Sequence, residues 1–212
     1  EGGAGLQDRT LRGFWDRVAG LYDLAELLNR RANLAMKRET ALWVPPGSRV
    51  LDCAAGTGAL SLAAARRAGY VLCTDLSPDM LARAKGKGER AGLMNMEFSR
   101  RDIFAPPPEE PFDVVIAGNV LHLLEEPRRA VNCLLSCVRP GGRVILPTYL
   151  QGEAWAGFRA AIGAYQALGF LFQERYTLEG YGVLLESCGA EVLCLKRLEG
   201  RLPVGFGVLG KL

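Results

Sequence analysis

The stretch R-V-L-D-C-A-A-G-T-G at residues 49–58 decides the fold class. Its first half is a short apolar run that ends in an aspartate and a cysteine, which is typical of a buried strand. Its second half is a glycine loop that leads into an alanine-rich helix at 59–68. Glycines permit a tight turn and a close approach of a ligand to the backbone, and the N–H groups at a helix start favour an anionic group. The stretch therefore predicts a strand–loop–helix unit with a ligand site at the loop.

Strands and helices alternate along the rest of the chain. Further strands are expected at 70–74, 96–99, 112–117 and 143–146, with helices at 11–41, 77–91, 126–138 and 178–187. Apolar strands such as 114–117 suggest burial on both faces. The last two strands, 191–198 and 203–209, are joined by so short a connection that they must run antiparallel. We expect an α/β fold with a doubly wound, mostly parallel, Rossmann-like sheet of seven strands, an antiparallel C-terminal pair and helices on both faces.

The length of 212 residues suits one domain. We expect residues 1–10 to form a flexible tail and residues 11–212 a single domain. Within the domain, residues 11–44 would form an N-terminal helical cap or lid, and residues 150–177 a helical insertion on the substrate side.

Composition narrows the class of protein. With 49% hydrophobic and 23% charged residues, the chain resembles a soluble globular protein. The net charge of +3 is spread along the chain, which argues against a nucleic-acid partner. The longest uncharged stretch, 160–173, is too short for a membrane span of ~20 residues, and no signal peptide is evident. Six cysteines without a C-x-x-C pair and a single histidine predict reduced thiols, no metal site and a cytoplasmic location. Nothing in the sequence predicts the oligomeric state.

A second acidic residue suggests what the loop binds. Asp75 ends the second strand, 17 residues after Gly58, where a carboxylate can accept hydrogen bonds from ribose hydroxyls. The two features together predict a nucleoside-bearing cofactor. Ser61 stands where a dinucleotide-binding loop has its third glycine, which weakens NAD without excluding it. A Walker loop is excluded because no G-K-[ST] follows.

Four segments, in order, resemble the motifs of class I S-adenosylmethionine-dependent methyltransferases. They are V-L-D-C-A-A-G-T-G-A at 50–59, T-D-L-S-P-D-M-L-A-R-A at 74–84, F-D-V-V-I-A-G-N-V-L-H-L-L at 112–124 and L-L-S-C-V-R-P-G-G-R-V-I-L at 134–146. The opening F-W-D-R-V-A-G-L-Y-D at 14–23 is similar to the leading helix of the quinone-biosynthesis group. One departure is Cys53, where the family more often has an aliphatic residue or glycine. The resemblance, which covers nearly the whole chain, implies a methyltransferase whose cofactor is S-adenosyl-L-methionine.

The resemblance also implies roles for single residues. Gly56, Thr57 and Gly58 would form the loop against the methionine part of the cofactor, Asp52 would orient the loop and the cofactor's amino group, and Asp75 would hold the ribose. Leu76 and Met80 would pack on the adenine, Asp102 and Ile103 would lie at its edge, Asn119 would lie near the methionine end and the substrate, and Tyr22 would fold over the cofactor. The alternative for Leu76, Met80, Ile103 and Tyr22 is plain packing, and the alternative for Asp102 is a turn or cap.

Methyl transfer from a sulfonium is an in-line displacement that depends mainly on alignment. A base is needed only if the acceptor loses a proton. The single histidine, His122, is the candidate base or substrate contact, and the alternative is a polar residue without chemistry. Tyr149, Trp155 and Phe158 belong to an aromatic-rich segment that could line a substrate pocket, and the alternative is ordinary helix packing.

The preferred hypothesis is methyl transfer to a small organic acceptor. The alternatives are a nucleic-acid or protein methyltransferase and a non-catalytic protein that binds S-adenosylmethionine. An NAD-dependent reductase is a more distant possibility.

Overall fold

The computed structural model describes residues 29–154 and 173–212. The predicted tail and the residues Tyr22, Trp155 and Phe158 lie outside the described residues. Seven strands form one sheet in the order β3-β2-β1-β4-β5-β7-β6. The strands are β1 (Arg49–Cys53), β2 (Tyr70–Asp75), β3 (Met96–Arg100), β4 (Phe112–Ile116), β5 (Val138–Tyr149), β6 (Glu191–Leu198) and β7 (Val204–Gly210). The first five are parallel, and β7 runs antiparallel to both β5 and β6. The predicted fold class is therefore confirmed.

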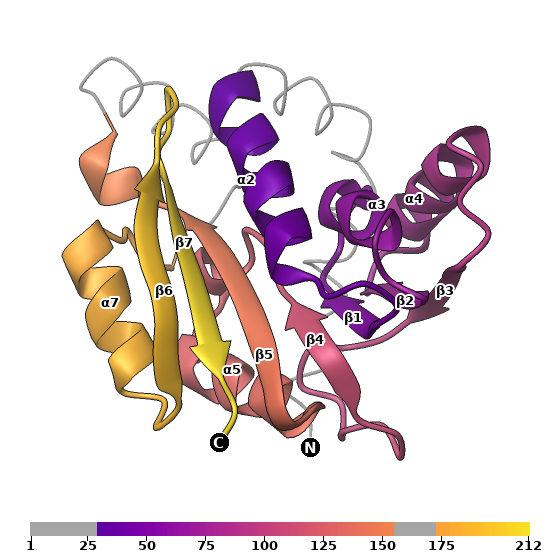
Figure 1. Cartoon of the computed structure of the whole chain (residues 1–212). Helices are drawn as coiled ribbons and strands as arrows, with labels where there is room; N and C mark the ends of the chain where they lie inside the picture. The colour runs from indigo at the N-terminus through magenta and orange to yellow at the C-terminus, as the bar shows by residue number, and fades with distance from the viewer. Residues whose placement is uncertain (1–28, 155–172) are drawn as a thin grey trace, which may run out of the picture.

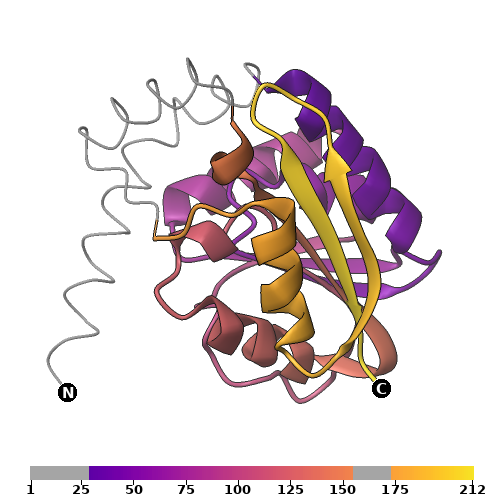
Figure 2. The same ribbon diagram turned by 90° about the vertical axis from the view of Figure 1, so that its left-hand side faces the viewer.

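Helices cover both faces of the sheet (Figures 1 and 2). One face carries α2 (Arg30–Trp43), α3 (Ala59–Ala65) and α4 (Pro78–Arg90), and the other carries α5 (Pro127–Ser136) and α7 (Leu178–Glu186). Two short 3₁₀ helices, η1 (Leu121–Leu123) and η2 (Gln151–Glu153), follow β4 and β5. In the described residues no helix has the length and apolar character needed to cross a membrane. The division of the chain into a tail, a cap and an insertion stays a prediction.

Two elements differ from the sequence-based expectation. The described part of the expected helix at 11–41 is α2, which ends at Trp43 and packs on the sheet through its buried residues Ala32 and Met36; residues 11–28 lie outside the described part of the chain. Strand β5 begins at Val138, whereas 143 was expected, because residues 139–142 do not end the preceding helix but form an irregularity within the strand. Pro140 is tolerated there because a bulge releases it from the hydrogen-bond ladder.

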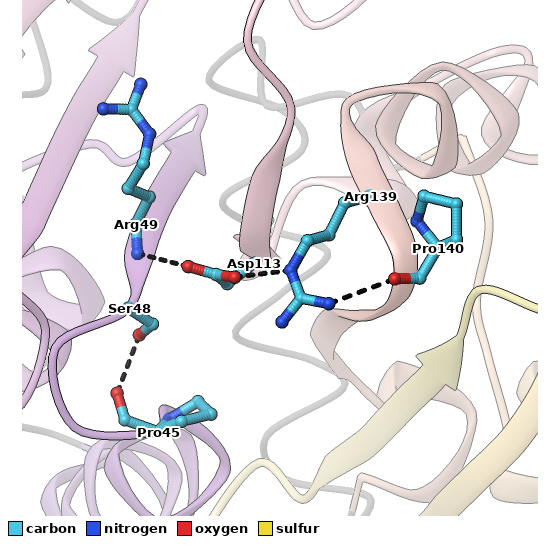
Figure 3. Close-up of polar contacts among 6 residues, drawn as sticks. All are labelled: Pro45, Ser48, Arg49, Asp113, Arg139 and Pro140. Atoms are coloured by element: carbon cyan, nitrogen blue, oxygen red, sulfur yellow. Dashed lines mark hydrogen bonds and ion pairs between the residues drawn. The ribbon is translucent and has the colours of Figure 1, made fainter.

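Asp113 ties three strands together at the sheet edge where the parallel strands begin (Figure 3). Its carboxylate accepts from the backbone N–H of Arg49 in β1 at 2.7 Å and from Nε of Arg139 in β5 at 2.6 Å. Partial burial acts to raise the pKa of Asp113, but these hydrogen bonds and the two arginine charges outweigh it and hold the pKa below its ordinary value. The amino ends of β1, β4 and β5 are therefore held together by hydrogen bonds and an ion pair of Asp113. Ligands of open α/β sheets bind at the opposite end, where the parallel strands finish.

Strand β7, with the sequence V-G-F-G-V-L-G, places Gly205 and Gly207 against α7. The ring of Tyr181 lies against Gly205 and Gly207, and its hydroxyl donates to the carbonyl oxygen of Leu146. A Cβ at Gly207 would lie 2.6 Å from Cδ1 of Leu185 and 2.7 Å from the Tyr181 hydroxyl. The glycines therefore let α7 sit directly on the sheet.

Gly207→Ala should lower the free energy of unfolding by about 1–3 kcal/mol, because the added methyl group overpacks this contact. Urea unfolding followed by circular dichroism measures the change. Gly180→Ala is the matched control, since Gly180 is exposed on α7 and its nearest neighbouring atom would lie 3.4 Å away. The control should be as stable as the wild type or slightly more stable. Equal unfolding midpoints for the two variants would contradict the close-packing argument.

Candidate functional site

The glycine loop between β1 and α3 depends on three residues with positive φ. Ala54 has φ 52°, Gly56 has φ 55° and Gly58 has φ 80°. The two glycines differ in their surroundings: a Cβ at Gly58 would lie 2.8 Å from Cβ of Ala84, whereas a Cβ at Gly56 would meet nothing within 4 Å. Gly58 therefore lets α3 pack against α4, and Gly56 is the glycine with open space beside it, as a ligand-binding loop requires.

Asp75 holds this loop in place from the end of β2. One carboxylate oxygen accepts from the backbone N–H of Gly56 at 2.8 Å, and the other accepts from the backbone N–H of Ser77 at 2.9 Å. The hydroxyl of Ser77 in turn caps α4 by accepting from the N–H of Met80 at 3.2 Å. Asp75 thus joins the glycine loop to the start of α4. The next residue of the loop, Thr57, is buried and accepts from Nζ of Lys87 at 2.8 Å.

A pocket with a volume of about 30 Å³ lies beside the loop. It is lined by Met36, Asp52, Ala54, Ala55, Thr57, Ala59, Leu60, Gly118 and Asn119, which come from α2, β1, the glycine loop, α3 and the end of β4. The sequence analysis singled out three of these residues, namely Asp52, Thr57 and Asn119. The structure thus brings together residues from three separate parts of the chain at the edge where parallel strands end, which is where open α/β sheets bind ligands.

Two buried acceptor atoms of this pocket have no hydrogen-bond partner among the described residues. One is Oδ1 of Asp52, whose side chain is 1% exposed and whose Oδ2 accepts from the Ser61 hydroxyl at 2.5 Å. The other is Oδ1 of Asn119. Buried polar atoms normally have partners, so two such atoms in one pocket indicate a ligand that donates hydrogen bonds.

Asn119 is held in an uncommon backbone conformation. Its φ is 54°, its N–H donates to the carbonyl oxygen of Pro147 at 2.7 Å, and its Nδ2 lies 3.8 Å from Sδ of Met36. Asparagine is among the few residues that adopt positive φ readily, and such residues often occur at binding sites. The neighbouring Gly118 makes room for Leu60, since a Cβ there would lie 2.4 Å from Cδ1 of Leu60.

Burial raises the pKa of Asp52 to about 7. The hydrogen bond from Ser61 opposes this shift, and the negative charge of Asp75 adds to it. Near neutral pH the carboxyl group is therefore balanced between its two forms. A cation beside Oδ1 would favour the ionised form.

The residues expected around an adenine lie on β2, α4 and the segment after β3. Met80 is buried in the α4 packing surface, while Leu76 and Ile103 are half-buried. Asp102 is exposed, and its carboxylate accepts from the N–H of Phe104 at 2.8 Å, which is the turn role considered as its alternative. Their contacts with a cofactor stay predictions.

His122 lies on η1 and is buried, with an exposed fraction of 2%. Its Nδ1 is 3.2 Å from the Thr148 hydroxyl, and its ring meets the edge of the half-buried Tyr149 with centroids 5.7 Å apart. Burial lowers the pKa of His122 to about 3, so the imidazole is neutral and a weak base at neutral pH. It is also absent from the pocket lining. The role of His122 as a base or substrate contact therefore stays a prediction, and in this structure the imidazole is buried.

Sequence reasoning missed two residues that shape the pocket. Ser61 was noted only as the residue that replaces a third glycine, yet it is the hydrogen-bond donor to Asp52. Met36 lies 83 positions before Asn119 in the chain, and no local pattern connects them.

Comparisons with known proteins agree with this geometry. A family model of the methyltransferase domain matches residues 50–142. A demethylmenaquinone methyltransferase from Clavibacter sepedonicus is 35% identical over 136 residues, which cover 62% of this chain and 55% of that protein. A demethylmenaquinone methyltransferase from Streptomyces avermitilis is 30% identical over 162 residues, which cover 75% of this chain and 68% of that protein. Several of the curated relatives that this chain matches are longer proteins, of which it spans about half the length.

The fold has a counterpart of known structure. Magnesium protoporphyrin IX methyltransferase from Synechocystis, solved with bound S-adenosylhomocysteine, matches with a TM-score of 0.76 over 97% of this chain and 99% of that chain. Its 16% identity shows a shared fold alone. From the similarity to the Streptomyces protein over two thirds of its length, the chain belongs to the class I S-adenosylmethionine-dependent methyltransferase family, whose cofactor is S-adenosyl-L-methionine, and is related to its quinone-biosynthesis group.

Proposed function

We propose that this chain transfers a methyl group from S-adenosylmethionine to a small organic acceptor, an oxygen-bearing aromatic ring of the quinone type. The observation that carries the proposal is the pair of unpartnered acceptors in the pocket, Oδ1 of Asp52 and Oδ1 of Asn119. The names of the Clavibacter and Streptomyces relatives support the acceptor class.

The residues of the pocket fit the amino-acid end of S-adenosylmethionine. An ammonium group is a pure donor, and the pocket offers it one carboxylate and one amide oxygen that have no partner among the described residues. The unbranched and flexible Met36 side chain lines the same pocket and can adapt to the ligand. The open space at Gly56 would admit the adjoining part of the cofactor.

Asp75, at the end of β2 beside the glycine loop, would hold the ribose. Leu76, Met80, Ile103 and Asp102 would surround the adenine, and Tyr22 would cover the cofactor. Tyr149, at the end of β5, would line the acceptor pocket, together with Trp155 and Phe158.

Bound in this way, the cofactor supplies the methyl carbon and the sulfur leaving group. The acceptor atom bonds to that carbon as the carbon–sulfur bond breaks, and any proton on the acceptor atom leaves to water. The chain's own contribution is alignment of the reactants and exclusion of water, for which no protein base is required. The reduced cysteines predict a cytoplasmic location for this reaction.

Asp52 makes cofactor binding depend on pH. Because the pKa of Asp52 is raised to about 7, the carboxyl group is protonated at pH 6 and must ionise to receive the ammonium group. The affinity for S-adenosylhomocysteine, measured by calorimetry, should therefore rise roughly tenfold from pH 6 to pH 7.5 and then level off. Asp52→Asn should bind more weakly and lose this slope.

Ser61→Ala is the matched variant for this experiment. It removes the hydrogen bond that lowers the pKa of Asp52, so the affinity should level off at a higher pH than in the wild type. A wild-type affinity that does not vary between pH 6 and pH 7.5, or an Asp52→Asn profile with the wild-type slope, would refute the assignment.

Asp75→Ala should weaken S-adenosylhomocysteine binding by an order of magnitude or more, since hydrogen bonds to a charged group are worth ~1.5–3 kcal/mol. The loss combines the ribose contact with release of the Gly56 N–H that Asp75 holds. Asp79→Ala, four residues further on at the exposed first turn of α4, is the control and should bind within about twofold of wild type. Unchanged affinity in Asp75→Ala would remove both roles.

The activity itself is tested with methyl-labelled S-adenosylmethionine and a cell extract divided into small-molecule, nucleic-acid and protein pools. Label in the organic-soluble small-molecule pool is the expected result, and the labelled compound should carry an oxygen-substituted aromatic ring. Label in a polymer pool would replace the proposal with a nucleic-acid or protein methyltransferase. No label in any pool, with S-adenosylhomocysteine still bound, would favour a non-catalytic binding protein.

A further inference from the structure

Gln151 is a buried amide without a hydrogen-bond partner. It is the first residue of η2, directly after β5, and its exposed fraction is 2%. Neither Nε2 nor Oε1 has a partner within residues 29–154 and 173–212. A primary amide offers two donors and two acceptor sites, and leaving all of them unmet inside a protein costs free energy of folding. Such an unmet group in a folded protein calls for an explanation, and a bound ligand is one.

Backbone hydrogen bonds on both sides of Gln151 fix its position relative to the strand ends. On one side Leu150 donates its N–H to the carbonyl oxygen of Pro203 at 2.8 Å, and on the other Gly152 donates to the carbonyl oxygen of Tyr176 at 3.0 Å. The segment that contains Tyr176 is fixed to the end of β4, since the N–H of Gln173 donates to the carbonyl oxygen of His122 at 3.0 Å. Gln151 therefore lies where the ends of β4 and β5 meet the start of β7.

This is the same sheet edge as the cofactor pocket. Asn119 follows β4 and is hydrogen-bonded to Pro147 of β5, four residues before Gln151. Because the nucleophile must reach the methyl carbon from beyond the strand ends, a polar group just past β5 is well placed to contact the acceptor.

The charged residue nearest to Gln151 along the chain, Glu153, is already paired. The carboxylate of Glu153 accepts from the N–H of Leu178 at 2.6 Å and forms an ion pair with Arg197 at 2.8 Å. His122, whose backbone anchors the neighbouring segment, is buried, and its Nδ1 lies within hydrogen-bond distance of the Thr148 hydroxyl. The surroundings thus favour a neutral polar ligand over a phosphate or a carboxylate.

We propose that the Gln151 side chain binds an oxygen atom of the uncharged acceptor, and so selects rings that carry a hydroxyl or a carbonyl group. The amide can accept from a phenolic hydroxyl through Oε1 or donate to a quinone carbonyl through Nε2. The inference rests on the proposed function, because it assigns a residue to the acceptor of that reaction.

Gln151→Met tests the inference, since methionine keeps the length of the side chain and removes both polar ends. The melting temperature should equal or exceed that of the wild type, because a buried unmet amide is lost. The Kd of S-adenosylhomocysteine should stay within twofold of wild type. The KM for 1,4-naphthalenediol, the reduced ring of a naphthoquinone, should rise at least tenfold.

Thr40→Val is the matched control. The Thr40 hydroxyl is also fully buried and without a hydrogen-bond partner in the described chain, but it lies on α2 rather than beyond the end of β5. This variant should leave the KM for the diol unchanged. A wild-type KM in Gln151→Met would overturn the inference, and so would an equal rise of KM in Thr40→Val.

Failure of the inference can be told apart from failure of the proposed function. If the wild type methylates the diol and Gln151→Met does so with the same KM, only the role of Gln151 is wrong. If the wild type neither methylates the diol nor binds it in the presence of S-adenosylhomocysteine, the acceptor class is wrong, and the inference about ring oxygens is overturned with it. Binding of the diol is read by calorimetry, independently of turnover.

Discussion

The carboxylate of Asp75 is the interaction on which the arrangement of the site depends. It accepts backbone hydrogen bonds from Gly56 and Ser77, and so joins the loop after β1 to the loop after β2. Parallel strands bring these two loops side by side, but they do not by themselves fix the loops' conformation. The hydrogen bond to Gly56 holds this residue at positive φ beside the pocket that contains Asp52. The hydrogen bond to Ser77 holds the residue that caps α4, the helix against which Gly58 packs.

The same arrangement creates an electrostatic cost. Asp52 and Asp75 end neighbouring strands, and the charge of Asp75 adds to the effect of burial in raising the pKa of Asp52. Two acidic groups in such proximity are tolerated because one is hydrogen-bonded to backbone and the other is protonated for part of the time. A site of this kind is matched to a cation, since a cation relieves the repulsion between the two carboxylates.

The strand ends could be predicted from sequence because their signals are local. The glycine loop, Asp52, Asp75 and Asn119 each follow a short apolar run, and all four are at the same edge of the sheet in the structure. The exposure of each side chain could not be predicted from local sequence, because it depends on residues from distant parts of the chain that pack against it. No local pattern indicates that His122 is buried beside Thr148, where its imidazole is a weaker base. Met36 and Gln151 carry no local signal, and the expected start of β5 at 143 was too late because the irregularity at 139–142 lies within the strand.

The position of β7 has a consequence for the order in which the sheet can assemble. Strand β7 pairs with β5 on one side and β6 on the other, and β6 has no other strand partner among the described residues. Strand β6 precedes β7 in the chain but can join the sheet only after β7 has done so. The five parallel strands can therefore form first, and the last two are added as a hairpin whose second strand docks first. Deleting residues 204–210 would remove β7 and leave β6 without a strand to pair with. A loss of seven residues would therefore remove two of the seven strands from the sheet.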